Sequence, residues 1–160
     1  IYLGWKANRI ADLPRVLALE AERKEAEILL VFLSGEIAST LSRADQLSQR
    51  LQNKDVRENY VRDARHREYI AAAFRGLEMP SSSAAMNRLH VLPAVLSHAL
   101  ARVMGLQRTL VGRATDIANA GLSDPAYDRE FTYLIQWLNV MIVDLAVVNT
   151  AADKATRFGA

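Results

Sequence analysis

The segment Phe131–Val148, FTYLIQWLNVMIVDLAVV, constrains the fold more than any other part of the chain, because fourteen of its eighteen residues are apolar. Such a run is either a membrane span or the central helix of a packed core. At 100° per residue, one narrow polar stripe holds Asp128, Thr132, Gln136, Asn139, Thr150, Asp153 and Arg157, with Val143 and Ala146 in its gap. A lipid-facing helix would also place Asp144 at mid-depth, at a cost of roughly 2.5 to 3.5 kcal/mol. We therefore expect a core helix with one solvent-exposed polar face.

The first half of the chain predicts one long helix over Arg15–Gln52. This range has no proline and a single glycine, and Pro14 precedes it at a place where a first helical turn tolerates proline. The segment Ile28–Leu33 is apolar all round, so we expect neighbouring helices to cover it on several sides. Gly35 marks either a bend that folds this helix back or a point where another helix comes close.

A second helix is predicted over Val56–Arg75. Asp55 and Glu58 have the spacing of a capping box, which opens a helix, and Gly76 is a typical C-cap. The sequence GLEMPSSS then combines glycine, proline and three serines, which predicts a loop.

The second half of the chain predicts two more helices. One covers Ala84–Ala120 with a kink or short break at His90–Pro93, because proline removes a donor and clashes with the preceding turn. The other covers Pro125–Arg157, with Asp124 as its N-cap, after a turn in which Gly121 ends the preceding helix.

These elements predict an all-α protein. A chain of 160 residues has the size of one domain, so residues 1–160 are expected to form a single helical bundle. Four helices joined by short connections favour an antiparallel up-down four-helix bundle, in which the first, third and fourth helices are long and the third is kinked near Pro93. In this topology the two ends of the chain lie at the same end of the bundle.

Composition and spacing exclude several kinds of site. The absence of cysteine rules out disulfides, thiolate metal sites and a cysteine nucleophile. His90 and His98 stand eight residues apart without a metal-ligand pattern, and no pair of titratable groups has a convincing catalytic spacing. Twenty basic residues nearly balance eighteen acidic ones, so no nucleic-acid partner is implied. We expect a non-enzymatic protein without metal or cofactor.

The densest charge cluster, Asp55–Glu68, is expected to neutralise itself on a helix surface. Glu58 with Arg62 and Asp63 with Arg67 are each four residues apart, the spacing of helical ion pairs. Arg67 also shares a stripe with apolar residues, so it is the candidate contact for a ligand or an interface. The alternative, which we favour, is that its stem passes the core edge and its head lies in water.

By this layout of four helices, the chain resembles the extracytoplasmic four-helix sensor domains of bacterial membrane receptors such as chemoreceptors, histidine kinases and diguanylate cyclases. The resemblance covers the whole chain and rests on no sequence motif. It implies a homodimeric domain for signal transduction that senses a small molecule or a protein. It also implies a place on the periplasmic or extracellular face of a bacterial inner membrane, with membrane contact only through flanking segments.

The alternative is a helical scaffold or assembly protein, such as a secretion-system component, a secreted effector or a virion structural subunit, that acts through an exposed helix face. In either case the second predicted helix is too short to cover its longer neighbours. We expect a homodimer with the first helix at the interface, or else a first helix that bends near Gly35.

Overall fold

The computed structural model describes residues 2–158, with side chains from residue 13 to residue 157. These residues form α1 (Tyr2–Leu51), α2 (Lys54–Arg62), α3 (Ala64–Arg75), α4 (Pro80–Ala84), the 3-10 helix η1 (Met86–Val91), α5 (Ala94–Asn119) and α6 (Asp124–Phe158). No strand occurs within them, which confirms the all-α prediction. Seven helices replace the predicted four, because the second and third predicted helices are each divided and a short helix, α4, forms in the predicted loop.

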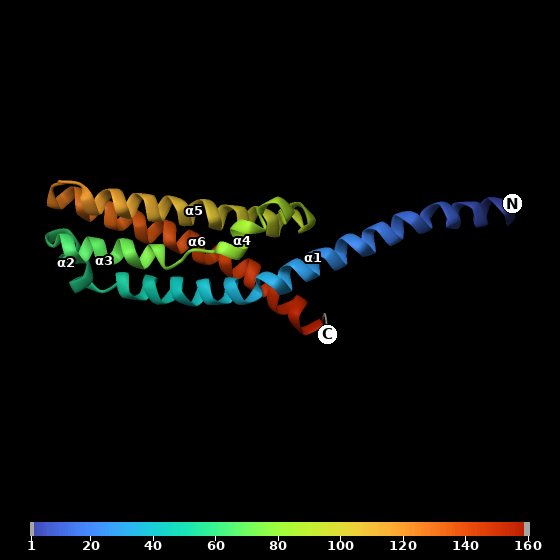
Figure 1. The fold of residues 1–160 in the computed structure, drawn as a ribbon, viewed down its shortest axis with the longest axis horizontal. Helices are drawn as coiled ribbons and strands as arrows, with labels where there is room; N and C mark the ends of the chain where they lie inside the picture. The colour runs from blue at the N-terminus through green and yellow to red at the C-terminus, as the bar shows by residue number, and fades with distance from the viewer. Residues whose placement is uncertain (1, 159–160) are drawn as a thin grey trace.

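Helix α1 is longer than predicted. It begins at Tyr2 rather than Arg15 and continues through Pro14, which was expected at its first turn. The N-terminal part, Tyr2–Lys24, projects past the other helices as a single extended helix, and we call it the arm (Figure 1). The remainder of α1 packs against α6. The helix continues through Gly35, so the alternative in which α1 folds back on itself there is wrong.

The second predicted helix is divided at Asp63. Asn53, rather than the predicted Asp55, caps α2, and its side chain accepts a hydrogen bond from the backbone N–H of Asp55 at 2.9 Å. Asp63 has extended backbone angles, φ −122° and ψ 119°, and its carboxylate accepts from the N–H of Arg65 at 2.9 Å. A residue that caps a helix in this way begins a new one. Gly76 ends α3 as predicted.

The predicted loop GLEMPSSS contains the start of α4, with Pro80 as its first residue. Glu36 on α1 holds this short helix: its carboxylate accepts from the N–H groups of Ser81 and Ser82 at 2.8 Å each and from the Ser82 hydroxyl at 2.7 Å. Burial by itself raises the pKa of Glu36, but these hydrogen bonds outweigh it and lower that pKa. The carboxylate supplies the acceptors that helix N-termini need.

The predicted interruption at His90–Pro93 is confirmed: η1 ends at Val91, and α5 begins at Ala94 directly after Pro93. The turn between α5 and α6 also lies where it was predicted, within one residue. Tyr127 closes this turn, because its hydroxyl donates to the carbonyl of Ala120 and accepts from the N–H of Leu122 at 3.2 Å.

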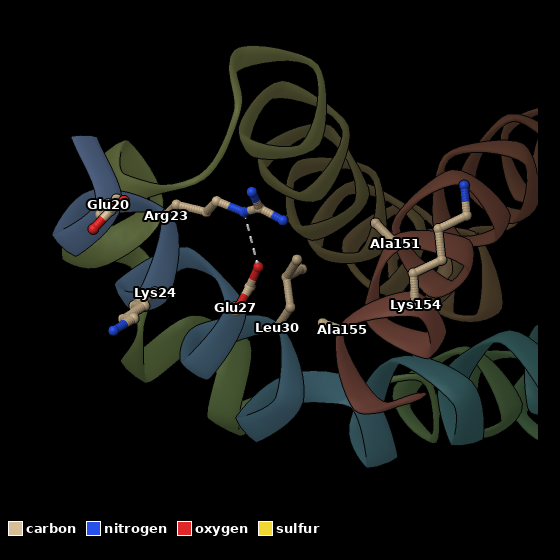
Figure 2. Close-up of a pocket in the computed structure, with 8 residues that line it drawn as sticks. All are labelled: Glu20, Arg23, Lys24, Glu27, Leu30, Ala151, Lys154 and Ala155. Atoms are coloured by element: carbon tan, nitrogen blue, oxygen red, sulfur yellow. Dashed lines mark hydrogen bonds and ion pairs between the residues drawn. The ribbon is translucent and has the colours of Figure 1, made fainter. Parts of the chain in front are cut away.

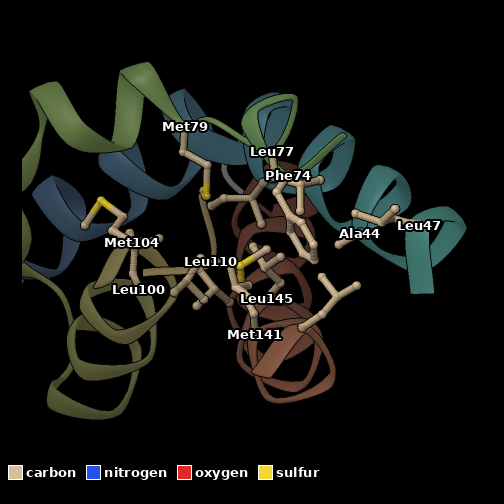
Figure 3. Packing of buried hydrophobic residues seen from close by; sticks show 14 of the residues in the cluster. Ala44, Leu47, Phe74, Leu77, Met79, Leu100, Met104, Leu110, Met141 and Leu145 are labelled. Atoms are coloured by element: carbon tan, nitrogen blue, oxygen red, sulfur yellow. The ribbon is translucent and has the colours of Figure 1, made fainter. Parts of the chain in front are cut away.

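Helix α6 lies at the centre of the packed part and contacts α1, α2 and α5. Its inward residues recur every three or four positions and are buried: Phe131, Leu134, Leu138, Met141, Leu145, Val148 and Ala152. Figure 3 shows two of them, Met141 and Leu145, packed with Phe74 of α3 and Leu100 of α5. All members of the predicted polar stripe are exposed or half-buried, so the predicted solvent-exposed face of this helix is confirmed.

Asp144, the acidic residue within the apolar run, is buried but paired. Both of its carboxylate oxygens accept hydrogen bonds from the guanidinium of Arg102 on α5, which lies over it. By length and composition, α6 is the one helix of the described residues that could cross a membrane, and 39% of its most apolar window is buried within the fold. A core helix passes the same test, and α6 buries one face among α1, α2 and α5 and leaves the other face exposed.

Candidate interaction surface

The arm has an exposed apolar surface. Every residue from Leu13 to Lys24 is exposed, and no other helix runs beside this part of α1 (Figure 1). Its large apolar side chains are about half exposed or more: Leu13 58%, Val16 49%, Leu17 56% and Leu19 58%. Large apolar groups scattered singly on a surface need no explanation, but several together on one unsupported helix indicate a contact surface.

The segment Ile28–Leu33 is covered on one side only. Leu29, Leu30 and Leu33 are buried, as the prediction of a covered helix requires. Their neighbours on the other side are not: Ile28 is 64% exposed, Val31 41% and Phe32 66%. The expectation that other helices of this chain surround the segment is therefore wrong, and half of its apolar surface faces outward.

The exposed residues of α1 form a regular stripe along the helix. Alternating spacings of four and three connect Leu17, Ala21, Lys24, Ile28, Val31, Gly35, Ala38 and Ser42, and each of them is exposed. We call this set the outer stripe. The buried residues of the same helix follow the same alternation on the opposite side, at Ala26, Leu30, Leu33, Ile37, Thr40, Ala44, Leu47 and Leu51. One helix thus has two seams of the kind that packs against another helix.

The side chains of the outer stripe become smaller toward its C-terminal end. Gly35, Ala38 and Ser42 are small, and a side chain added at Gly35 would meet no atom within 4 Å. Small residues allow the backbone of a second helix to approach closely. The N-terminal half of the stripe has the larger side chains, including Leu17 and Ile28.

A cleft of about 490 Å³ lies at the base of the arm, where α1 and the end of α6 diverge (Figure 2). Leu30 and Ala155 form part of its floor. Its walls carry charge of both signs: Arg23 on α1 is paired with Glu27 at 3.1 Å, and Lys154 on α6 lies across from them (Figure 2). These opposite charges largely neutralise one another, so the cleft has no strong preference for an anion or a cation.

A second exposed apolar face lies on α6. Its members are Tyr133 (51% exposed), Trp137 (38%), Val140 (45%), Val143 (62%) and Val147 (42%). Gln136 is exposed among them, and the Arg102–Asp144 pair lies along the same side of the helix. The members of this face are larger than most of the outer stripe, and polar groups interrupt both surfaces, at Gln136 on α6 and at Lys24 and Ser42 on α1.

Arg67, the predicted contact residue, is committed to the fold. Its side chain is buried, with 8% of the residue exposed, and Nη1 donates to the backbone carbonyls of Tyr60 and Val61 at 2.9 and 3.0 Å. Its guanidinium carbon lies 3.9 Å from the ring centroid of Tyr127. The expectation that the head lies in water is wrong. Arg67 satisfies carbonyls at the end of α2 that have no partner within that helix.

The ion pairs predicted for this cluster do not form among the described residues. Glu58 pairs with Lys54 at 3.6 Å instead of Arg62, and Asp63 lies 3.7 Å from His66 instead of pairing with Arg67. The division at Asp63 explains the missing Asp63–Arg67 pair, because Asp63 caps α3 instead of continuing the helix, whereas Glu58 and Arg62 both remain within α2. Burial raises the pKa of the nearby Tyr60 hydroxyl to about 12, although the charge of Arg67 acts in the opposite direction.

The histidines lie apart from one another. The imidazole of His90 bonds to the carbonyl of Asn87 at 2.9 Å, and His98 is exposed on α5. Within the described residues, no group of three or more histidine and acidic side chains could hold a metal ion.

Sequence reasoning marked Arg67 and missed the outer stripe. The signal was present, since the four-three alternation from Leu17 to Ser42 can be followed in the sequence. It was overlooked because Ile28–Leu33 was taken to be covered on several sides, although the first helix was expected at a dimer interface. No protein-family model, curated protein or solved structure matches this chain.

Proposed function

We propose that this chain is a non-enzymatic interaction domain that forms a parallel homodimer through the outer stripe of α1 and serves as the sensing part of a membrane receptor. The outer stripe carries the proposal, because it is a second helix-packing seam that no described residue of its own chain covers. Burying apolar surface is the main driving force of such association.

A second copy of the chain is the partner that the stripe fits best. A parallel pair of identical helices places each position of a heptad stripe beside its own copy, and symmetric dimers use the same patch on both subunits. The stripe spans residues 17 to 42, which is roughly 38 Å of helix at 1.5 Å per residue. Lys24 is its only charged member, and Glu20 and Glu27 on its flanks provide carboxylates that can reach Lys24 of the partner subunit.

The arrangement of the helices supports the receptor reading. In Figure 1, α1, then α2 with α3, then α5 and α6 run in alternating directions, and we take these four columns as an antiparallel four-helix bundle. Both ends of the described chain lie toward the same end of the packed part (Figure 1). A helical arm that leaves the bundle at that end is suited to transmit a change in the bundle along its axis.

The second candidate function is a scaffold or assembly protein, and the exposed face of α6 at Tyr133–Val147 favours it. A chain with two separate interaction faces builds larger assemblies, whereas one self-complementary face closes as a dimer. The residues that flank this sequence at each end discriminate the two functions, because apolar spans on both sides select the receptor.

The mass of the particle in solution tests the proposal. Multi-angle light scattering at micromolar concentration is expected to give twice the 17.8 kDa of the single chain. Ile28→Glu places a charge in the outer stripe and is expected to give monomers with unchanged helical content. Val95→Glu is the matched control, since Val95 is 72% exposed on α5, away from the stripe. A wild-type monomer, or equal dimerisation of both variants, would refute the α1 dimer.

Disulfide cross-linking tests the parallel arrangement. The chain has no cysteine, so a single introduced thiol reports only its own neighbourhood. Leu17→Cys, at the N-terminal end of the outer stripe, is expected to form a disulfide-linked dimer under mild oxidation, and Val95→Cys is not. In an antiparallel pair aligned along the stripe, residue 17 would lie roughly 38 Å along the helix from its own copy, so that a failure of Leu17→Cys to cross-link in a proven dimer would reject the parallel form.

A further inference from the structure

A cavity of about 750 Å³ lies between the C-terminal end of α1, the start of α2 and the middle of α3. It exists because α1 packs closely against α6, and α3 against α5, whereas α1 and α3 do not pack closely against each other in the described part of the chain. Its volume falls within the range of roughly 300 to 1,000 Å³ that is usual for small-molecule sites.

The floor of the cavity is apolar and belongs to the packed core. Leu47 and Leu51 of α1 and Ile70 of α3 line it, and they are 7%, 2% and 2% exposed. All three belong to the hydrophobic core, and Leu47 appears at the edge of that core in Figure 3. Because these side chains are almost fully buried, a ligand would touch only their edges, and most of its apolar contact would come from the half-buried Val56 and the exposed ring of Tyr69.

The rim of the cavity carries hydrogen-bond donors and one positive charge. Arg50 on α1 donates from Nη1 to the hydroxyl of Tyr69 on α3 at 3.3 Å, which leaves the hydroxyl proton of Tyr69 available. The carbonyl oxygen of the Asn53 side chain already accepts from the N–H of Asp55, so its amide group is free to donate into the cavity mouth.

No acidic residue lines this cavity, and Arg50 takes part in none of the ion pairs of the described residues. Two other arginines at contacts between helices differ in this respect, because Arg57 and Arg113 are each bound to a carboxylate. A guanidinium with its donor edge free, beside a phenol and an amide, matches the hydrogen-bond needs of a carboxylate.

We propose that this cavity binds a small organic carboxylate with an aromatic or bulky apolar body. The apolar body lies between Val56 and the ring of Tyr69, which is 58% exposed, above the edges of the buried core residues. The carboxylate is bound by Arg50 and the Tyr69 hydroxyl. Such a ligand would bridge α1 and α3, two helices that otherwise do not pack closely. The inference names the class of ligand for the sensing role proposed above and rests on that role.

Calorimetric titration with 1-naphthylacetate tests the site. The wild-type chain is expected to bind this probe, and 1-naphthylacetamide, which has the same ring but no charge, is expected to bind at least ten-fold more weakly. Arg50→Gln is expected to weaken binding of the acid at least ten-fold and to leave binding of the amide unchanged. Arg75→Gln is the matched control, because it removes an equal charge from an exposed position of α3 outside the cavity.

Each remaining outcome counts against the inference. No binding of 1-naphthylacetate by the wild-type chain at millimolar concentration overturns it, as does equal binding of the acid and the amide. Equal weakening by Arg50→Gln and Arg75→Gln overturns it too, because it shows attraction to net charge instead of a built site. The acid and amide comparison needs only the wild-type chain. Since the cavity lies within one chain, the mass measurement decides the dimer separately from this titration.

Discussion

The two parts of α1 differ in their surroundings more than in their sequence. From Ala26 to Leu51 the helix buries one face against α6 and the rest of the core, whereas in the arm every described residue is exposed. Both parts carry leucine and valine at helical spacing. The comparison teaches that an apolar seam on a helix indicates the presence of a partner but does not say whether the partner lies in the same chain.

A helix of the arm's length is only partly stable in water without tertiary contacts. Isolated helices below about 12 to 15 residues are marginal, and longer ones remain only partly formed without tertiary contacts. The packed part of α1 gains its stability from buried side chains, and the arm has none among residues 13 to 24. The proposed dimer supplies contacts to both parts through the outer stripe.

Amide hydrogen exchange should show the largest difference between the two parts. In dilute, monomeric protein, amides from Leu29 to Leu47 are expected to open only with global unfolding, at about 5 to 15 kcal/mol, while amides of the arm exchange with almost no protection. At dimerising concentration, amides around Leu17 and Ala21 should become protected. Strong protection of the arm in dilute monomer would break the comparison, because it would show a partner within the chain.

The next largest expected difference is in the free energy of unfolding, between substitutions at two adjacent residues of α1. Leu33 is fully buried and Phe32 is 66% exposed. Leu33→Ala is expected to lower the free energy of unfolding by about 2 to 5 kcal/mol, since it leaves a cavity in the core. Phe32→Ala should change it by less than about 0.5 kcal/mol in the monomer. Urea denaturation at low concentration measures both, and similar losses would show that Phe32 is covered in solution.

The sequence was sufficient for the parts of the fold that depend on local signals. The turn at Asp124 and Pro125, the interruption at Pro93 and the polar stripe of α6 follow from capping residues, proline geometry and helical periodicity. These signals act over a few residues, and no distant contact competes with them. The all-α class followed for the same reason.

The sequence was not sufficient where distant side chains decide the structure. The division at Asp63 is stabilised by Arg67, whose guanidinium binds carbonyls at the end of α2 beneath the ring of Tyr127, about sixty residues away in sequence. Likewise, α4 is fixed by Glu36 of α1. The outer stripe was visible as a pattern, but only the structure showed which of the two seams of α1 remains uncovered.

Acidification should affect the packed part of α1 and not the arm. The pKa of Glu36 is lowered from 4.5 in the folded state, so its contribution is present above the unfolded pKa and is lost as pH falls through the folded pKa. Glu36→Gln should lower stability at pH 7 by about 1 to 2 kcal/mol, because charge-assisted bonds to Ser81 and Ser82 are weakened. Measured in dilute, monomeric protein, Glu20→Gln in the arm is expected to have no effect on the free energy of unfolding.

The pH profile of unfolding separates these variants. Below about pH 4.5 the wild-type protein should lose stability more steeply than Glu36→Gln, so that the two curves converge, whereas Glu20→Gln should run parallel to the wild type throughout. A constant difference between the wild type and Glu36→Gln across this range would show that the carboxylate of Glu36 does not hold α4 on α1.

Gly35→Ala is expected to have the smallest effect on the free energy of unfolding. It also tests most directly whether two copies of α1 meet closely at Gly35. A side chain at Gly35 would meet no atom within 4 Å, and the same holds for Gly112 on α5. Alanine in place of a glycine inside a helix is expected to stabilise the monomer by about 0.5 to 1 kcal/mol, so both Gly35→Ala and Gly112→Ala should raise its free energy of unfolding. Only Gly35 lies in the outer stripe, where an added methyl group would separate two closely packed helices. Sedimentation equilibrium should therefore show a weaker dimer for Gly35→Ala and an unchanged one for Gly112→Ala. If both variants dimerise as the wild type does, the helices do not meet closely at Gly35, and the uncovered seam of α1 has a different partner.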